Sequence, residues 1–294
     1  MLLNLDNRYL EKSQAEGNFV IEIRNDFHLY QVGKQVAETG TYRLYLCRDE
    51  AGSQCLLQIA LATANNGGLQ RTAYVLKELE RYADELEEEY ARVKKDPEAM
   101  LNYKLGFPEL VDSFVSQEQG ARHINILAFR NVGDVRSMVP LSNITAKDRL
   151  RVDERTSAWI MGKLLKLLVF AFSEGFSIEA TGNNVLIEPK LHYVLIFDWS
   201  TAQVFPEAVP RETQSLQISK AAQAVVVVLG GELETGTFPD NSTKAYTDFV
   251  LHLARGGMRD AEQAHKEFYA LVDALWERKY HPFTTKPLRN EEEN

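Results

Sequence analysis

The sequence predicts an α+β protein of two lobes, a small β-rich N-terminal lobe with one long helix and a larger, mainly α-helical C-terminal lobe. Three observations support this prediction. Short runs of alternating apolar and polar residues fill much of residues 18–130. One stretch with three- and four-residue apolar spacing interrupts them. Residues 131–288 are mainly helical in pattern, apart from a hairpin directly after a strongly apolar helix. A loose arm, 1–17, and a frayed tail, 289–294, are expected at the ends.

The N-terminal half begins with four expected strands, FVIEIR, HLYQVGKQVA, TYRLYLCRD and QCLLQIALA. A helix is expected from about residue 69 to 95, because apolar residues recur there at helical spacing. Two further strands follow, ELVDSFVSQ and RHINILAFR. Cys47 and Cys55 flank the turn at 50–53, so they can lie close together across neighbouring strands. We interpret them as two buried thiols rather than part of a disulfide framework.

The C-terminal half begins with residues 131–150, which are expected to form a loop with little regular structure. The apolar run SAWIMGKLLKLLVFAFSEG predicts a buried helix that ends at Gly175. The strands NVLIE and YVLIFDWS then form a hairpin, and Ser219 is placed to cap the helix KAAQAVVVVLGG. Amphipathic helices are expected within 243–255 and 259–278.

The composition bears on the partners of this protein and on its location. Acidic residues outnumber basic ones 42 to 33, for a net charge of -9, which argues against nucleic acid or an anionic membrane as the main partner. The longest apolar stretch, Ala224 to Leu229, is too short to span a bilayer. The first residues lack the pattern of a signal peptide. We therefore expect a cytoplasmic protein with no nucleic-acid and no membrane partner.

The stretch from Gly175 to Ser200 resembles the catalytic region of eukaryotic-type protein kinases. In these enzymes a loop of the form H-R-D-x-x-x-x-N leads into an apolar strand, and D-F-G follows. Here G-F-S-I-E-A-T-G-N-N-V-L-I-E is followed by V-L-I-F-D-W-S. The resemblance implies that Asn184 and Asp198 hold the metal-binding positions and that Glu179 holds the position of the catalytic base.

An amide and a carboxylate at the ends of adjacent strands suit a divalent cation, which prefers oxygen ligands and bridges phosphates during phosphoryl transfer. Asn184 and Asp198 would supply that pair. The alternative for both is a structural role, because Asn before a strand and Asp after one often stabilise turns.

The N-terminal half resembles the nucleotide-binding lobe of the same family, with losses at charged positions. Gly40 and the strand after it resemble the end of a glycine-rich loop, and Gly33 resembles a remnant of its start. The strand C-L-L-Q-I-A resembles V-A-I-K, with Gln58 at the lysine position and Leu56 at the alanine that leaves room for adenine. A neutral glutamine cannot attract phosphates as lysine does. The resemblance also implies nucleotide contacts from Arg43 and Leu186.

These departures imply a pseudokinase, a catalytically impaired kinase-like module that binds or regulates a protein partner. Ser200 stands where D-F-G has glycine, and Phe205 to Glu207 resembles A-P-E only a few residues later, which leaves little chain for docking a peptide substrate. We expect ATP and magnesium to bind weakly or not at all, and no cofactor is assigned.

The alternative is an active, atypical Ser/Thr kinase-like phosphotransferase. Glu179 would then act as the base, and Arg43 or Lys34 would replace the missing lysine charge. The extra methylene of glutamate displaces its carboxylate by about 1 Å, and such misplacement is costly in catalysis. A solvent-facing position on a strand is the other interpretation of Arg43. A third hypothesis is a kinase-like fold that serves unrelated chemistry or structural assembly.

Overall fold

The computed structural model describes residues 21–239, 242–277 and 279–288, so the predicted arm 1–17 and tail 289–294 lie outside the described residues. The chain divides into two compact units. The first contains the residues up to Tyr74 together with Glu109–Val135, and the second contains Val75–Pro108 and everything from Arg136 onward. The long helix α2 (Asn66–Lys94) contributes its first turns to one unit and the remainder to the other.

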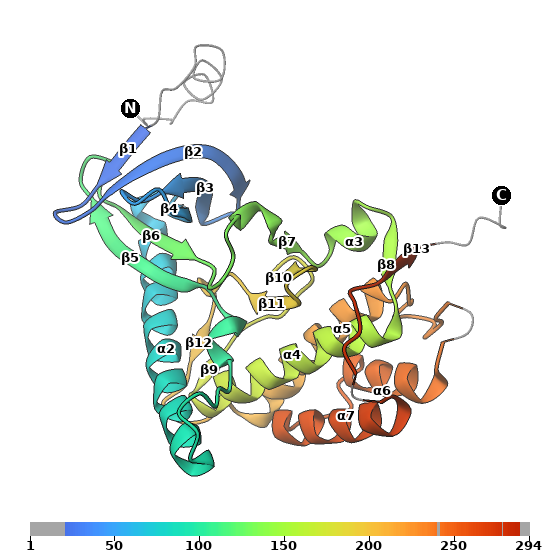
Figure 1. Ribbon diagram of the computed structural model, residues 1–294. Coiled ribbons are helices and arrows are strands. Elements are labelled where there is room, and N and C mark those ends of the chain that lie inside the picture. The colour runs from blue at the N-terminus through green and yellow to red at the C-terminus, as the bar shows by residue number, and fades with distance from the viewer. Residues whose placement is uncertain (1–20, 240–241, 278, 289–294) are drawn as a thin grey trace. The chain divides into compact units, whose positions relative to one another are not determined.

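The first unit is built on a six-stranded antiparallel sheet (Figure 1). Its strands, in spatial order, are β1 (Ile21–Arg24), β2 (Leu29–Glu38), β3 (Tyr42–Arg48), β4 (Gln54–Ala60), β6 (Arg122–Ala128) and β5 (Glu109–Ser116). All six strands were expected from the alternating pattern. The 3₁₀ turn η1 (Thr63–Asn65) connects β4 to α2.

One face of this sheet carries an apolar core, which includes Tyr45, Leu57 and Ile126. The sheet curls around that core, because β2 near one edge and β5 at the other are joined by hydrogen bonds. The Tyr30 hydroxyl donates to Asp112 Oδ2 at 2.9 Å, and Asn25 Nδ2 donates to the same oxygen at 2.5 Å. A buried face closed in this way is shielded from water although the sheet remains open.

Cys47 and Cys55 belong to this core and confirm their expected proximity. They are direct partners across β3 and β4, both are buried, and their Sγ atoms lie 2.9 Å apart as free thiols. The hydrogen bond with Cys55 and burial both raise the pKa of the Cys47 thiol. The pair therefore behaves as a small apolar contact between the strands.

The second unit is mainly helical, as expected. Its helices are η2 (Tyr103–Gly106), α3 (Asn143–Ala146), α4 (Glu154–Ser173), α5 (Arg211–Val228), α6 (Lys244–Ala254) and α7 (Ala261–Leu275), and the short 3₁₀ turn η3 (Val135–Ser137) spans the boundary of the two units. Its strands are short: β7 (Val139–Pro140), β8 (Leu150–Val152), β9 (Phe176–Ser177), β10 (Val185–Glu188), β11 (Tyr193–Ile196), β12 (Gln203–Val204) and β13 (Thr285–Pro287).

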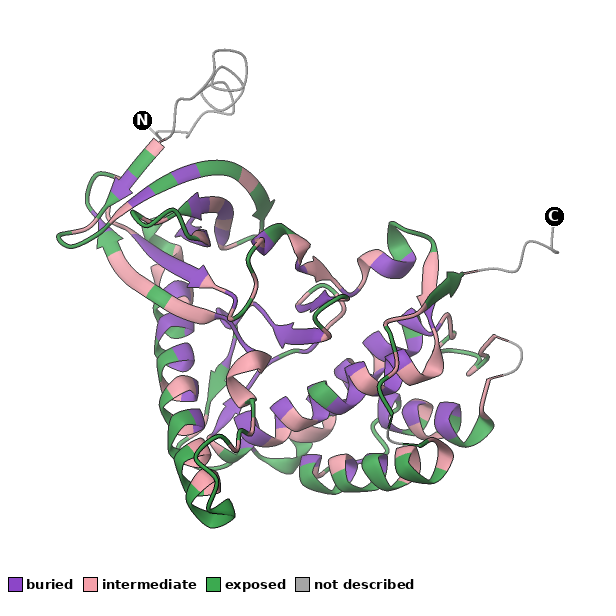
Figure 2. Ribbon diagram, viewed as in Figure 1, coloured by how far each residue is buried: buried purple, intermediate pink, exposed green. Residues whose placement is uncertain are grey.

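Helix α4 forms the centre of this unit and packs against α5 and α7. Figure 2 shows most of its turns buried, and its length and composition alone would allow it to cross a membrane. In the structure 72% of the apolar window is buried, as in the core helix of a globular domain. The helix ends at Ser173, and Gly175 follows with a φ of +77°, a backbone conformation that favours glycine.

Two expectations for this half were wrong. Residues 131–150 are not a plain loop, since β7 pairs with β10, and β8 pairs with β13 far along the chain. Ser219 does not cap a helix, because α5 begins eight residues earlier at Arg211. Ser219 instead lies buried within α5, and its hydroxyl donates to the Ala254 carbonyl of α6 at 2.5 Å.

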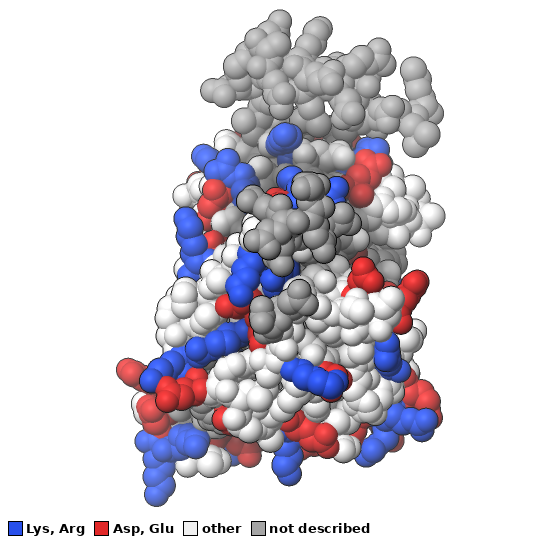
Figure 3. Space-filling model, turned by 90° about the vertical axis from the view of Figure 1, so that its right-hand side faces the viewer, with Lys and Arg blue, Asp and Glu red and all other residues white. Residues whose placement is uncertain are grey.

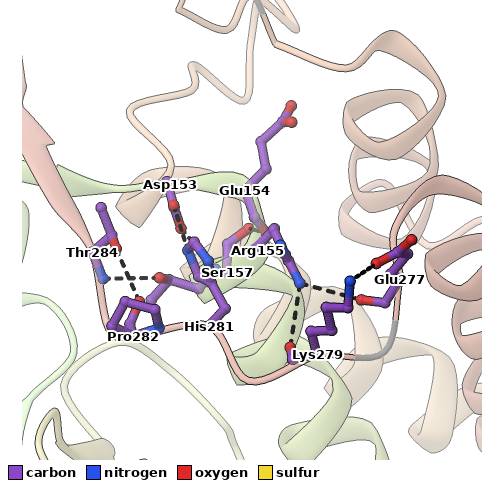
Figure 4. Close-up of polar contacts among 10 residues, drawn as sticks. Asp153, Glu154, Arg155, Ser157, Glu277, Lys279, His281, Pro282 and Thr284 are labelled. Carbon is purple, nitrogen blue, oxygen red and sulfur yellow. Dashed lines mark hydrogen bonds and ion pairs between the residues drawn. The ribbon is translucent and has the colours of Figure 1, made fainter.

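The C-terminal segment 279–288, here called the C-terminal strap, is fastened to the start of α4 (Figure 4). Asp153 caps α4 by accepting from the Thr156 amide at 2.8 Å through Oδ1, and its Oδ2 lies 2.7 Å from His281 Nε2. The Thr284 amide donates to Thr156 Oγ1 at 3.0 Å, and Arg155 donates to the Glu277 carbonyl. One carboxylate thus serves both the helix cap and the strap.

Replacing Asp153 tests this double role. We expect Asp153→Ala to lower the free energy of unfolding by about 2 kcal/mol, because a helix cap and a charge-assisted hydrogen bond are both lost. Asp153→Asn is the matched control and should cost less, since the amide oxygen still caps the helix. Urea unfolding measures both variants. Equal losses in the two variants would contradict the cap assignment.

Candidate functional site

Gln58, at the lysine position of the resemblance, lies in the interior of the first unit. Its exposure is 0%, and in the sheet it is the partner of Leu44 on one side and Asn125 on the other. Gln58 Oε1 accepts a hydrogen bond from Asn125 Nδ2 at 3.1 Å. The same Nδ2 group donates to the Leu69 carbonyl in α2 at 2.9 Å. Gln58 therefore lies on the sheet face that meets the first turns of α2.

The polar cluster extends from Asn125 to two neighbours on β5 and β6. The Ser113 hydroxyl donates to Asn125 Oδ1 at 2.9 Å, and His123 Nε2 lies 3.1 Å from the same oxygen. The His123 amide donates to Asn66 Oδ1 at 2.8 Å, which anchors the first residue of α2 to β6. Burial lowers the pKa of His123, and the hydrogen bond with Asn125 opposes that shift. Burial therefore disfavours the charged form of His123.

The register also decides where Arg43 points. Arg43 is the strand partner of Ile59, so its side chain leaves the sheet on the face opposite to Gln58. Its Nε lies 2.7 Å from Glu38 Oε2, and this hydrogen bond raises the pKa of Arg43. Arg43 therefore lies on a strand and forms an ion pair with Glu38 within the β2–β3 hairpin, and its side chain is only partly exposed to solvent. Lys34 is exposed.

The other expected nucleotide contacts of the first unit are small or apolar. Leu56 is buried two residues before Gln58 and shares its face of the sheet. Gly40 lies in the β2–β3 turn, where a Cβ would meet nothing within 4 Å. A Cβ on Gly33 would lie 3.4 Å from the Leu46 carbonyl oxygen, so the strands pass closely there. None of these three residues has a charged side chain that could contact a phosphate.

In the second unit the structure brings Asn184 and Asp198 together. Asn184 precedes β10 and Asp198 follows β11, and the pairing of the two strands fixes their proximity. Asn184 Oδ1 accepts from the Asp198 amide at 2.6 Å, and its Nδ2 donates to the carbonyls of Asp198 at 3.1 Å and Glu179 at 2.9 Å. A single side-chain amide thus ties three segments of backbone together.

The Asp198 carboxylate takes part in the turn that follows. Its Oδ1 accepts from the Ser200 amide at 2.9 Å. Trp199, between them, is fully buried and donates from its ring nitrogen to the Ile196 carbonyl at 2.9 Å. Asn184 and Asp198 therefore both hold backbone turns in place, which is the structural role given above as the alternative to metal binding.

These roles bear on whether a magnesium ion fits. A hard divalent cation needs several oxygen ligands, and here the Asn184 amide oxygen and one Asp198 oxygen already accept from backbone N–H groups. In the described part of the chain, no group of three or more His, Cys, Asp or Glu side chains is arranged to hold a metal. The described side chains alone therefore do not form a complete cation site, and most ligands of a magnesium ion would have to be phosphate or water oxygens.

Glu179, at the position of the catalytic base, is exposed and forms an ion pair with Lys220 of α5. Ser177, two residues before Glu179, is buried in β9, which pairs with β12. Leu186 is buried in β10 opposite Leu195. The carboxylate of Glu179 thus already has a cationic partner supplied by the protein.

The segment between Asp198 and α5 is short and packed. Pro210 directly precedes α5, and the Phe205 amide donates to the Gly175 carbonyl at 2.8 Å. A Cβ on Gly175 would lie 2.5 Å from the Phe205 carbonyl oxygen and 2.7 Å from that of Glu207. The segment therefore lies directly on the end of α4, and only glycine allows this approach.

Sequence reasoning missed four residues of these clusters. Ser113, His123 and Asn125 gave one usable signal, since polar residues alternate with apolar ones in β5 and β6, whereas a fully buried strand would be apolar throughout. Lys220 gave none, because it lies 41 positions from Glu179. Only the folded chain brings such pairs together.

The buried position of Gln58 leads to a direct test. We expect Gln58→Lys to lower the free energy of unfolding at pH 7 by about 3 to 5 kcal/mol, because it buries an unpaired charge. Burial lowers the pKa of the introduced amine, so the loss should shrink as the pH rises towards about 10. Gln58→Met, the matched control, should cost about 1 kcal/mol at every pH. A Gln58→Lys variant as stable as the wild type at pH 7 would contradict the buried placement.

His123 predicts a pH dependence of stability. Its pKa is lowered in the folded state, so below the unfolded value of about 6.5 the unfolded chain binds more protons. The free energy of unfolding should therefore fall as the pH drops from 7.5 to 5.5, by at most about 1.4 kcal/mol per pH unit for this one proton. His123→Gln should reduce that slope in urea titrations. An unchanged slope would mean that His192 and His265, whose pKa values are also lowered by burial, account for it.

Comparisons with known proteins agree with this geometry. No protein-family model and no curated protein sequence matches the chain. Among solved structures, the BubR1 kinase domain aligns with a TM-score of 0.58 at 10% identity, covering 87% of this chain and 84% of that one. Vaccinia related kinase 3 aligns with a TM-score of 0.58 at 11% identity, covering 91% and 96%. Together with the antiparallel sheet of the first unit and the helices of the second, these similarities show that the chain has a protein-kinase-like fold.

Proposed function

We propose that this protein is a pseudokinase, a kinase-like module that acts by binding a protein partner and does not transfer phosphate. The environment of Gln58 carries the proposal. At the position of the phosphate-binding lysine the chain has Gln58, a neutral amide with 0% exposure. Its Oε1 accepts a hydrogen bond from Asn125 Nδ2. Phosphoryl transfer depends almost entirely on positioning and on offsetting the charge of the phosphates. A buried neutral amide offers neither the charge nor the reach.

The position of the base supports the same proposal. Glu179 is paired with Lys220 of α5, so its carboxylate would have to leave this ion pair to reach a substrate hydroxyl. The chain between Asp198 and Pro210 is short and lies on the end of α4. Such a segment offers little surface for aligning a peptide substrate. The losses therefore affect phosphate binding, proton transfer and substrate docking together.

A protein is the proposed class of partner, and the cytoplasm is the proposed location. The net charge is -9, and on the face drawn in Figure 3 Lys and Arg are interspersed with Asp and Glu. Such a mixed surface lacks the extended positive field that nucleic acids and anionic membranes attract. The two thiols are free, as is usual in a reducing compartment.

A second candidate function is an active, atypical phosphotransferase. The proximity of Asn184 and Asp198 favours it, because both lie at the positions that the kinase resemblance assigns to metal binding. Glu179 would have to leave Lys220 to act as a base. The two candidates differ in what ATP does to the protein, which a simple experiment measures.

Nucleotide binding is expected to be absent or very weak. In thermal-shift assays with about 1 mM ATP and magnesium, we expect no change in Tm, because Gln58 provides no charge for the phosphates. A ligand present at a hundred times its Kd would add about 2.7 kcal/mol of stability, which such an assay would detect. Asp198→Ala, measured beside the wild type, should behave the same with and without nucleotide.

Catalysis distinguishes the two candidates further. With labelled ATP we expect no transfer to the protein itself or to a generic substrate, and Gln58→Lys together with Glu179→Asp should not create it. A metal-dependent rise in Tm that disappears in Asp198→Ala would favour the active enzyme. So would transfer that falls at least about a hundredfold in Glu179→Ala, the effect expected for losing a positioned base.

A further inference from the structure

A small cavity lies in the second unit between η2, α4 and the turn that joins β10 to β11. Its volume is about 60 Å³. The residues that line it include Asn102, Tyr103, Lys163, Lys166 and His192. One water occupies about 10 to 15 Å³ by the same kind of measure, so the cavity has room for a tetrahedral oxyanion. None of these residues belongs to the kinase-like positions described above.

Two lysines of α4 line this cavity. Lys163 and Lys166 are three positions apart and therefore lie on the same face of the helix. Lys166 Nζ donates to the Leu101 carbonyl and lies 4.9 Å from the centre of the Tyr103 ring, which fixes its ammonium group beside η2. Lys163 is exposed, and within the described part of the chain it makes no ion pair and no hydrogen bond. At least one charge at this cavity is therefore without a partner.

The cationic groups here also oppose one another. Burial lowers the pKa of Lys163, and both burial and the charge of Lys163 lower that of Lys166. The pKa of His192 is lowered by burial first, and then by His281 and Lys163. Glu87 is the one carboxylate whose attraction acts on Lys166 in the opposite direction. In a chain of net charge -9, this is a local excess of positive charge.

We propose that this cavity is a phosphate-binding site in which Lys163 and Lys166 provide the charged contacts. Two ammonium groups match the nearly two negative charges that a phosphate group carries at neutral pH. Each ammonium has three donors, and Lys166 uses one of them on Leu101, so donors remain for the phosphate oxygens. A bound phosphate would offset the repulsion between the lysines and would link α4 to η2 and the β10–β11 turn.

The phosphate group has two sources, free inorganic phosphate or a small phosphate monoester. Calorimetric titration with inorganic phosphate and with glycerol phosphate, at constant ionic strength set by chloride, distinguishes them. Tighter binding of glycerol phosphate assigns the site to a monoester, and equal binding assigns it to free phosphate. The proposal is independent of the pseudokinase assignment, because no residue of the cavity is at a kinase-like position.

The decisive variant is Lys163→Gln together with Lys166→Gln. We expect it to weaken phosphate binding at least about tenfold, the effect of losing a hydrogen bond to a charged group. Lys77→Gln, an exposed lysine of α2 with the same change in net charge, is the matched control and should bind as the wild type does. Lys163→Arg should retain binding because it preserves the charge. Lys163→Gln alone removes no contact within the described chain, so it tests the site if the double variant is unstable.

Three results would overturn the proposal. The first is a phosphate effect on binding heat or Tm no larger than that of chloride at equal ionic strength. The second is binding that survives in both Lys163→Gln and the double variant, or that falls equally in Lys77→Gln. The third is acetate binding as tightly as phosphate, since a single negative charge does not need two ammonium groups.

Discussion

The first unit depends on the hydrogen bond between Gln58 and Asn125, because it joins two fully buried amides at the centre of the polar cluster between the sheet and the first turns of α2. A buried amide without partners costs several times the free energy that its hydrogen bond contributes, so the pair is stable only while both members are present. Through the Leu69 carbonyl the pair also fixes the first turns of α2 against the sheet. This pair therefore links β4, β6 and the first turns of α2.

The second unit repeats this arrangement with other residues. The Asn184 amide joins the backbone at Glu179 and Asp198, and the Asp198 carboxylate accepts from the next turn. In both units, side chains at kinase-like positions hold backbone segments in place. Backbone ties of this kind stabilise the fold whether or not a nucleotide binds.

The sequence predicted the elements in which the spacing of apolar residues shows which face is buried. The six strands of the sheet, α2 and α4 follow from alternation or helical spacing, and Gly175 from its place after an apolar helix. Elements that depend on distant partners were missed. Strands β7 and β8 have two and three residues, and each exists because β10 or β13 pairs with it. The motif spacing likewise predicted that Asn184 and Asp198 meet, but not that Lys220 would reach Glu179.

The charged side chains of this protein do not lie where the kinase resemblance expects them. Where the kinase resemblance expects charge near phosphates, the chain has a neutral amide at Gln58 and an ion pair at Glu179. Where the resemblance expects no charge, α4 carries Lys166 and the exposed Lys163, which has no ion-pair partner among the described residues. Burying an unpaired charge is costly, whereas a half-exposed lysine keeps its water and its charge at little cost. The fold therefore tolerates positive charge at the edge of α4 far better than beneath α2, and any anion that this protein binds is more easily held at that edge.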